Sequence, residues 1–178
     1  MKTANLRALR RAPKTDSLDL TLRMALINVR SLANKIFVLN DFFTSYKLDF
    51  TLLTETWLHV GESASFSELL PPNCTCFSSP RTTGKGGGLA TVFKSTFQCR
   101  LSASVNYSSF ELQLFELNAS SSSTLCAVVY RPPKFNKDFM QDFADFIAGL
   151  RLNYDHFIIC GDLPYMYAVK TNLWLKIS

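Results

Sequence analysis

The stretch Ile158-Ile159-Cys160-Gly161-Asp162-Leu163 decides the fold, because its apolar, β-branched start predicts a buried strand that ends at a carboxylate. Two further strand-like runs upstream end in the same way, one at Asn28 and one at Glu55. A carboxamide and two carboxylates at strand ends are oxygen donors of the kind that Mg²⁺ prefers, with water and phosphate completing its coordination. The sequence therefore predicts a site for a divalent cation and a phosphate at one edge of a sheet.

Apolar residues recur at helical spacing in two places and form short runs elsewhere. The helical spacing predicts helices over about residues 35–47 and 136–152, the first with Asn34 as its N-cap and the second with Asp138 near its N-terminus. The short runs predict strands over residues 25–29, 50–54, 75–78, 88–93, 97–102, 110–117, 125–130 and 156–160. Residues 111–114 alternate apolar and polar, which predicts one solvent-facing side for that strand. This order of elements predicts an α+β fold.

Five short segments follow one another along the chain: Leu26-Ile27-Asn28-Val29-Arg30-Ser31-Leu32, Leu53-Thr54-Glu55-Thr56-Trp57-Leu58, Gly86-Gly87-Gly88-Leu89-Ala90, Val129-Tyr130-Arg131-Pro132-Pro133 and Ile159-Cys160-Gly161-Asp162-Leu163. Together they resemble the endonuclease/exonuclease/phosphatase superfamily, and most closely the apurinic-like endonuclease domain of non-LTR retrotransposons. The resemblance covers about residues 24–163. It implies part of a four-layer α/β/β/α sandwich whose C-terminal part is missing, and Mg²⁺-dependent hydrolysis of phosphodiesters in DNA.

The resemblance also implies roles for the polar residues at the strand ends. Glu55 would bind the cation, and Asn28 would contact the phosphate and the shell of the metal. Tyr130 would contact the scissile phosphate, and Asp162 would orient or deprotonate the attacking water. Each residue also has a purely structural interpretation, for example Asn28 as a turn-forming residue and Tyr130 as an amphipathic residue at a strand edge.

Two arginines that follow strand ends are candidate DNA contacts. Arg30 comes two residues after Asn28, and Arg131 follows Tyr130 directly. A guanidinium is a charge-assisted donor that suits a phosphate backbone. The resemblance therefore makes DNA the expected partner, and no small-molecule cofactor is expected beyond Mg²⁺.

One position departs from the pattern of the superfamily. Two residues beyond Asp162 the superfamily normally has Asn, whereas this chain has Pro164, which carries neither a side-chain donor nor an N–H. Neither His59 nor His156 stands in the motif of the catalytic histidine. We therefore expect a fragment of a retrotransposon-derived endonuclease that is impaired or inactive. The alternatives are an active Mg²⁺-dependent nuclease or phosphodiesterase and a non-catalytic nucleic-acid-binding or interaction module.

Charge and the extent of the resemblance together divide the chain into three parts. Residues 1–23 contain six Lys or Arg and two Asp, which accounts for most of the net charge of +5. This part is expected to be a disordered basic arm, either simply solvated or touching nucleic acid. Residues 24–163 are expected to form the domain, and residues 164–178 a tail without a family match. A sandwich cut in this way is expected to expose apolar sheet faces and to self-associate.

The remaining composition bounds the class of protein. Hydrophobic residues make up 47% of the chain, which is typical of a globular domain. No apolar run reaches the ~18 residues of a membrane helix, and no secretory signal is recognisable, so a nuclear or cytoplasmic location is expected. Cys126 and Cys160 lie in strand-like runs, which predicts buried, reduced thiols. Cys74 and Cys76 lack the second pair of ligands that a zinc site needs.

Overall fold

The computed structural model describes residues 22–82, 84, 86–102, 107–119, 122–134 and 136–163. Most of the predicted basic arm and the predicted tail, including Pro164, lie outside the described residues. Among the described residues, no helix has the length and apolar character needed to cross a membrane.

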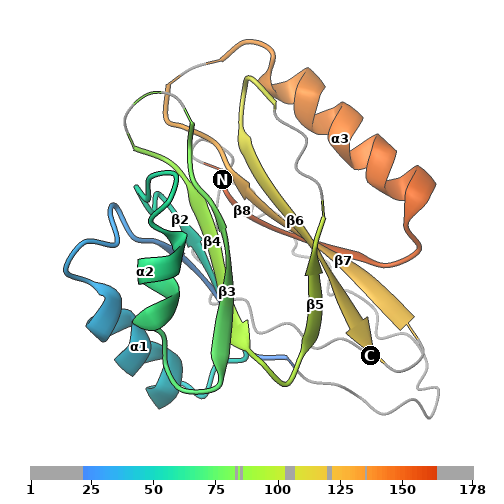
Figure 1. Ribbon diagram of the computed structural model, residues 1–178. Coiled ribbons are helices and arrows are strands. Elements are labelled where there is room, and N and C mark those ends of the chain that lie inside the picture. Colours follow the sequence, from blue (N-terminus) through green and yellow to red (C-terminus); the bar gives the residue numbers. More distant parts are fainter. Residues whose placement is uncertain are drawn as a thin grey trace, which may run out of the picture.

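Two four-stranded sheets form the structure (Figure 1). The first sheet has the order β1 (Met24–Asn28), β2 (Phe50–Thr54), β4 (Leu89–Lys94), β3 (Cys74–Ser79). The second sheet has the order β5 (Gln98–Leu101), β6 (Glu111–Ala119), β7 (Ser122–Tyr130), β8 (Phe157–Asp162). Each sheet contains one parallel pair, β1 with β2 and β7 with β8, and its other neighbours are antiparallel.

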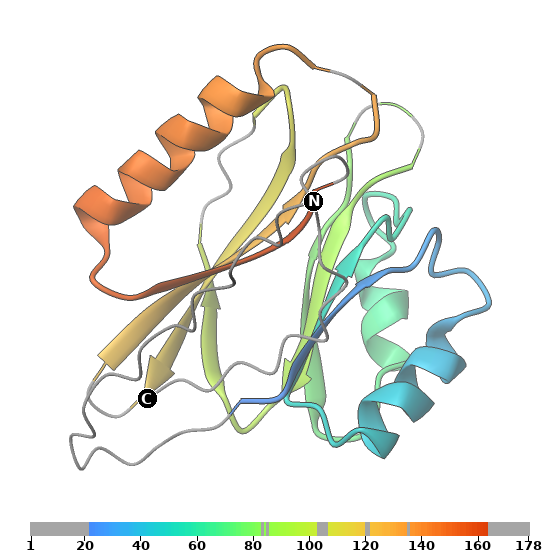
Figure 2. The same cartoon turned by 180° about the vertical axis from the view of Figure 1, so that it is seen from behind.

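The helices cover the outer faces of the two sheets. Helices α1 (Ile36–Ser45) and α2 (Ser63–Glu68) lie against the first sheet, and α3 (Phe139–Asn153) lies against the second (Figures 1 and 2). Three apolar clusters fill the spaces between these layers, one between the sheets and one beneath the helices on each side. The expected α+β sandwich of four layers is therefore confirmed for the described part of the chain.

Aromatic rings join the two sheets at the centre of the sandwich. Phe50 of β2 is fully buried, and its ring centroid lies 6.0 Å from that of Phe115 of β6 and 5.7 Å from that of Phe93 of β4. Offset ring contacts in this range add to the stabilisation from apolar burial. The high phenylalanine content of the chain is therefore used to pack one sheet on the other.

The strand over residues 111–114 differs from its expected half-solvated character. Gln113 is fully buried, like Leu112 and Leu114 beside it. Its Oε1 accepts a hydrogen bond from Thr91 Oγ1 (2.6 Å), and its Nε2 donates to Ser79 Oγ (2.9 Å). The alternating pattern was misleading because both faces of this sheet are covered, and the buried carboxamide is satisfied by polar side chains of the first sheet.

Helix boundaries also differ in detail from those expected. Asn34 has φ 60° and does not cap α1, whose N-cap position is Lys35 without a side-chain cap bond. Helix α3 begins at Phe139, because the Asn136 side chain accepts the Asp138 N–H (2.9 Å) and forms a turn ahead of the helix. The short helix α2 was not expected from the sequence.

Candidate active site

The carboxyl ends of the two parallel strand pairs meet at one end of the sandwich. Asn28 ends β1, and Asp162 ends β8 in register with Tyr130 at the end of β7. Strands β1 and β8 are the edge strands of their sheets and contact each other across the sandwich (Figure 2). This contact brings together side chains that are 134 positions apart in the sequence.

The four residues proposed for phosphate and metal binding form one hydrogen-bonded cluster. Asn28 Nδ2 donates to Glu55 Oε1 (2.9 Å) and to Asp162 Oδ2 (2.7 Å). The Tyr130 hydroxyl donates to the same Glu55 Oε1 (2.9 Å), and Thr54 Oγ1 donates to Asp162 Oδ2 (3.3 Å). One carboxamide therefore bridges two carboxylates, one from each half of the sandwich, at a spacing that a single phosphate group can span.

Tyr130 is held in its protonated form by its surroundings. Its side chain is buried at the edge of the central core. Burial raises the pKa of the Tyr130 phenol, and the hydrogen bond to Glu55 and the charge of that carboxylate raise it further. At neutral pH Tyr130 is therefore a hydrogen-bond donor that faces the cluster.

The backbone that carries Glu55 lies in an unusual conformation. Glu55 has φ 54° and Trp57 has φ 56°, both in the left-handed region that bulky residues rarely adopt. The carbonyl oxygens of Glu55 and Thr56 accept the N–H groups of Ser31 (2.8 Å) and Leu32 (2.9 Å). This ladder of bonds beyond the ends of β1 and β2 holds the strained segment in place, and such strain is concentrated at functional sites.

Three consecutive glycines, Gly86 to Gly88, support the same segment from the other side. Gly88 has φ 83°, and a Cβ placed on it would lie 2.7 Å from Thr56 Oγ1. The carbonyl oxygens of Gly87 and Gly88 accept the N–H groups of Trp57 (2.9 Å) and Thr56 (3.1 Å). The glycines therefore allow a close approach between this loop and the backbone of residues 56–57.

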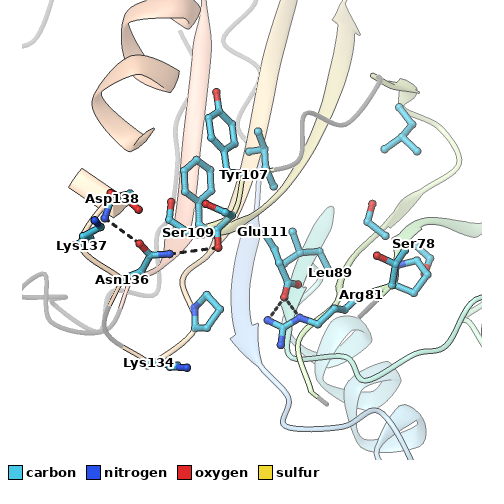
Figure 3. A pocket seen from close by; sticks show the side chains of 18 residues that line it. Ser78, Arg81, Leu89, Tyr107, Ser109, Glu111, Lys134, Asn136, Lys137 and Asp138 are labelled. Carbon is cyan, nitrogen blue, oxygen red and sulfur yellow. Dashed lines mark hydrogen bonds and ion pairs between the residues drawn. The ribbon is translucent and has the colours of Figure 1, made fainter. Parts of the chain in front are cut away.

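A clamp between the two sheets fixes this glycine loop and was not predicted from the sequence. Glu111, at the start of β6, accepts the Gly88 N–H (2.6 Å) and forms an ion pair with Arg81, which Figure 3 shows. Glu111 pairs with Tyr130 across β6 and β7. The only signal in the sequence was a charged residue at the start of a strand in which apolar and polar residues alternate, and its two partners are 23 and 30 positions away.

The two candidate DNA-binding arginines occupy different environments. Arg30 is exposed, has φ 43°, and donates its backbone N–H to Asn28 Oδ1 (3.2 Å). Arg131 is only 9% exposed, and its guanidinium lies 4.1 Å from the centroid of the Phe139 ring. Arg131 therefore packs α3 onto the end of β7, and its role in DNA binding stays a prediction.

The donor set of the cluster suits a hard cation. Among the described residues, no group of three or more His, Cys, Asp or Glu side chains is placed to hold a metal ion. Mg²⁺ is commonly held by one or two carboxylates, with water and substrate phosphate as its other ligands. Glu55 and Asp162 supply such oxygen ligands at the end of the sandwich where the two parallel strand pairs meet. The residues present therefore fit a largely hydrated cation.

Neither histidine takes part in the cluster. His156 precedes β8, at the opposite end of that strand from Asp162, which is roughly 20 Å away at the rise of an extended chain. His59 is exposed, and its backbone N–H bonds to Glu62 Oε2 (2.8 Å). These are the two histidines of the chain, both lie among the described residues, and neither imidazole is hydrogen-bonded to the cluster.

Comparison with known proteins supports the fold through structure alone. No model of a protein family matches the sequence, and no curated protein matches it. A structure of an endonuclease/exonuclease/phosphatase family protein from Bacteroides thetaiotaomicron is similar with a TM-score of 0.61 and 12% identity, over 82% of this chain and 64% of that one. The endonuclease domain of TRAS1, a telomere-specific non-LTR retrotransposon, is similar with a TM-score of 0.55 and 12% identity, over 79% and 58%.

A third similar structure is that of D. rerio TDP2 complexed with a single-strand DNA product, with a TM-score of 0.56 and 11% identity, over 80% of this chain and 60% of that one. In each of these three comparisons the chain spans about three fifths of the length of the solved structure. The described residues therefore have the fold of the endonuclease/exonuclease/phosphatase superfamily.

Proposed function

We propose that the cluster of Asn28, Glu55, Tyr130 and Asp162 is the phosphate- and metal-binding part of a DNA endonuclease site of the retrotransposon type. We further propose that residues 1–178 alone have impaired or no activity. The observation that carries the proposal is the bridge from Asn28 Nδ2 to the Glu55 and Asp162 carboxylates, with the Tyr130 hydroxyl on Glu55. It gathers two acids, an amide and a neutral phenol around one point.

Each group has a task in phosphodiester hydrolysis that its geometry supports. The Asn28 amide and the Tyr130 hydroxyl are neutral donors that suit phosphoryl oxygens. Asp162, held through Oδ2 by Asn28 and Thr54, is placed to accept a proton from a water molecule at its second oxygen. A bound divalent cation supplies positive charge that polarises a phosphoryl oxygen and stabilises the leaving group. Glu55 is the residue that would hold it.

The lack of an imidazole in the cluster supports impaired catalysis by residues 1–178. Charge that develops on the phosphate in the transition state needs preorganised donors. Neither histidine of the chain supplies one at the cluster, and position 164 is a proline without a donor group. Groups that act together in catalysis cause large losses when several are absent.

A groove lined by the Arg81–Glu111 clamp supports DNA as the partner. It has a volume of about 1180 Å³ and runs between the loops that flank β3, β6 and α3 (Figure 3). Lys134 and Lys137 line it, on the loop that follows Tyr130. The similar TDP2 structure holds a single-strand DNA product, and the similar TRAS1 domain is an endonuclease of a retrotransposon. The nuclear or cytoplasmic location expected from the sequence stays a prediction.

Nicking of supercoiled and of abasic plasmid DNA with Mg²⁺ tests the proposal. Residues 1–178 are expected to show no measurable nicking, with or without Pro164→Asn. Fusion of the Pro164→Asn chain to the C-terminal part of an active endonuclease of this fold is expected to produce metal-dependent nicking. Glu55→Ala should abolish that activity, whereas the exposed Glu68→Ala should not.

Two results would contradict the proposal. If the unmodified chain nicks DNA and Glu55→Ala removes that activity, the chain is an active nuclease and the impairment is wrong. If the folded fusion protein stays inactive with every divalent cation tested, the cluster is not part of an endonuclease site, and the non-catalytic binding module remains.

A further inference from the structure

A second cavity opens on the first-sheet side of the cluster and has no task in the proposed hydrolysis. Its volume is about 820 Å³. It is lined by the loop that follows β1, by the segment that follows Glu55, and by α2, with Leu32 and Phe66 as buried apolar walls. Trp57 stands at its rim, and 48% of this residue is exposed.

The position of the Trp57 indole is enforced by the backbone. A left-handed conformation costs a bulky residue about 1–2 kcal/mol, and Trp57 adopts it with φ 56°. The Trp57 N–H is bonded to the Gly87 carbonyl (2.9 Å). A Cβ on Gly86 would lie 3.3 Å from the indole Nε1, so the missing side chain of Gly86 leaves the space that the ring uses. The fold therefore accepts strain to keep a large aromatic ring half in solvent.

The cavity lies next to the phosphate cluster along the chain, because Thr56 and Trp57, which line it, directly follow Glu55. Trp57 comes two residues after Glu55, so their Cα atoms are at most about 7.6 Å apart. Glu55 turns into the cluster, whereas Trp57 lines the cavity, and both orientations come from the same strained segment. A ligand held at the cluster by a phosphate would therefore present its neighbouring group to the indole.

We propose that this cavity is a subsite for an unpaired nucleobase, which stacks on Trp57 while a phosphate of the same strand occupies the cluster. This inference rests on the proposed function. Nucleobases stack on aromatic side chains with little dependence on sequence, and each such contact contributes about 1–3 kcal/mol. The apolar walls at Leu32 and Phe66 suit the face of a base that has left its helix, whereas a paired base keeps its faces inside the duplex. The subsite thus favours single-stranded or locally unpaired DNA.

Tryptophan fluorescence tests the subsite without any need for catalysis. The chain has two tryptophans, Trp57 and Trp174, so Trp174→Phe leaves Trp57 as the only indole. Titration with a short oligothymidine in the presence of Ca²⁺ should quench this fluorescence. An oligomer of the same length made of abasic nucleotides should bind with little quenching, and a blocked duplex should not quench.

Variants separate stacking from phosphate binding. Trp57→Ala should weaken oligothymidine binding by about tenfold or more, as expected for the loss of one stacked base, and should leave binding of the abasic oligomer unchanged. Trp57→Phe should retain most of the affinity, which also shows that the segment folds. Tyr46→Ala, at an exposed aromatic that follows the last residue of α1, is the matched control and should have no effect.

The inference is overturned if wild type and a folded Trp57→Ala bind oligothymidine equally, or if the oligomer binds without changing Trp57 fluorescence. It is also overturned if no single-stranded oligomer binds. These failures are distinct from failure of the proposed function, which is decided by metal-dependent nicking in the fusion protein and its loss in Glu55→Ala. If the fusion protein nicks DNA equally well with Trp57→Ala, the proposed endonuclease function stands and the proposed base subsite is wrong.

Discussion

The two sheets differ in the backbone conformation that positions their site residues, although in each sheet these residues lie at the end of one parallel strand pair. In the first sheet, the chain beyond β1 and β2 turns through left-handed residues at Arg30, Ser31, Glu55 and Trp57. In the second sheet, no residue of 122–134 or 136–163 has a positive φ, and the Arg131 N–H simply continues the ladder to the Asp162 carbonyl (3.0 Å). Strained loops joined by hydrogen bonds hold one half of the site, and regular strands hold the other half.

This difference teaches where the site is vulnerable. Strain persists only where the surrounding structure determines the backbone completely. The first half therefore depends on the glycine loop and on the Glu111 clamp that reaches it from the second sheet. The second half depends on ordinary strand pairing and on packing beneath α3. Substitutions near the site should therefore reduce the free energy of unfolding strongly in the first half and only slightly in the second.

The largest expected effect comes from weakening the packing between the two sheets. Phe50→Ala removes a fully buried ring that packs on Phe115 of the other sheet, and such truncations cost about 3–5 kcal/mol. The midpoint of thermal unfolding should fall by about 6–20 °C, since 1 kcal/mol shifts the midpoint of a chain of this size by about 2–4 °C. The exposed Phe37→Ala on α1 is the control and should change stability by less than about 0.5 kcal/mol.

Circular dichroism during that melt also tests whether the halves are independent. A single cooperative transition in the wild type is expected, because the central core is shared by both sheets. Two separate transitions in the wild type would contradict the picture of one sandwich and would make the two halves separate units.

A smaller effect is expected from the glycine loop. Gly88→Ala places a methyl group 2.7 Å from Thr56 Oγ1 at φ 83° and should reduce the free energy of unfolding by about 2 kcal/mol. In the second sheet, a Cβ on Gly161 would lie 3.2 Å from the flexible side chain of Leu163, so Gly161→Ala should cost less.

Gly149→Ala, in the middle of α3 with nothing near its Cβ, should stabilise the protein by about 0.5–1 kcal/mol. Urea unfolding of the three variants measures the series. Equal losses for Gly88→Ala and Gly161→Ala would remove the contrast between strained and regular halves.

The smallest effect is expected from the thiol of Cys160, which lies in the core between the two sheets. Burial raises the pKa of Cys160 from 9.0 to about 11. Above pH 9 the unfolded chain loses this proton, whereas the folded chain keeps it. The contribution of the thiol to the free energy of unfolding is therefore complete below pH 9 and is lost as the pH rises toward 11. Cys160→Ala should flatten this fall in urea unfolding measured across alkaline pH. An identical pH profile in the variant would show that the thiol is not buried as described.

The parts of the fold that were predictable are those encoded locally. Apolar runs that stop at Asn28, Glu55 and Asp162 are visible in the sequence, because a buried strand and its polar end are neighbours along the chain. The two long helices follow from their apolar stripes in the same way. The meeting of Asn28 with Asp162 was inferred from the chemistry of the polar strand ends and from the resemblance, since no local pattern joins residues 134 positions apart.

The parts that were missed are set by contacts between distant segments. Gln113 resembled a solvent-facing residue, but its partners Thr91 and Ser79 come from the other sheet. The packing of the Arg131 guanidinium on the Phe139 ring of α3 was also not predicted. The left-handed turn at Trp57 carries no Gly or Asn as a signal, because hydrogen bonds to the glycine loop impose it.

The central claim is that the ends of β1 and β8 meet in one site, and a double-mutant cycle between Asn28 and Asp162 tests it most directly. Urea unfolding would be measured for Asn28→Ala, Asp162→Ala and the double variant, with Asn28 and Asp145 of α3 as a distant control pair. The 2.7 Å bond to a carboxylate predicts a coupling of about 1 kcal/mol for the first pair and none for the control. Losses for Asn28 and Asp162 that add within about 0.3 kcal/mol would contradict the claim.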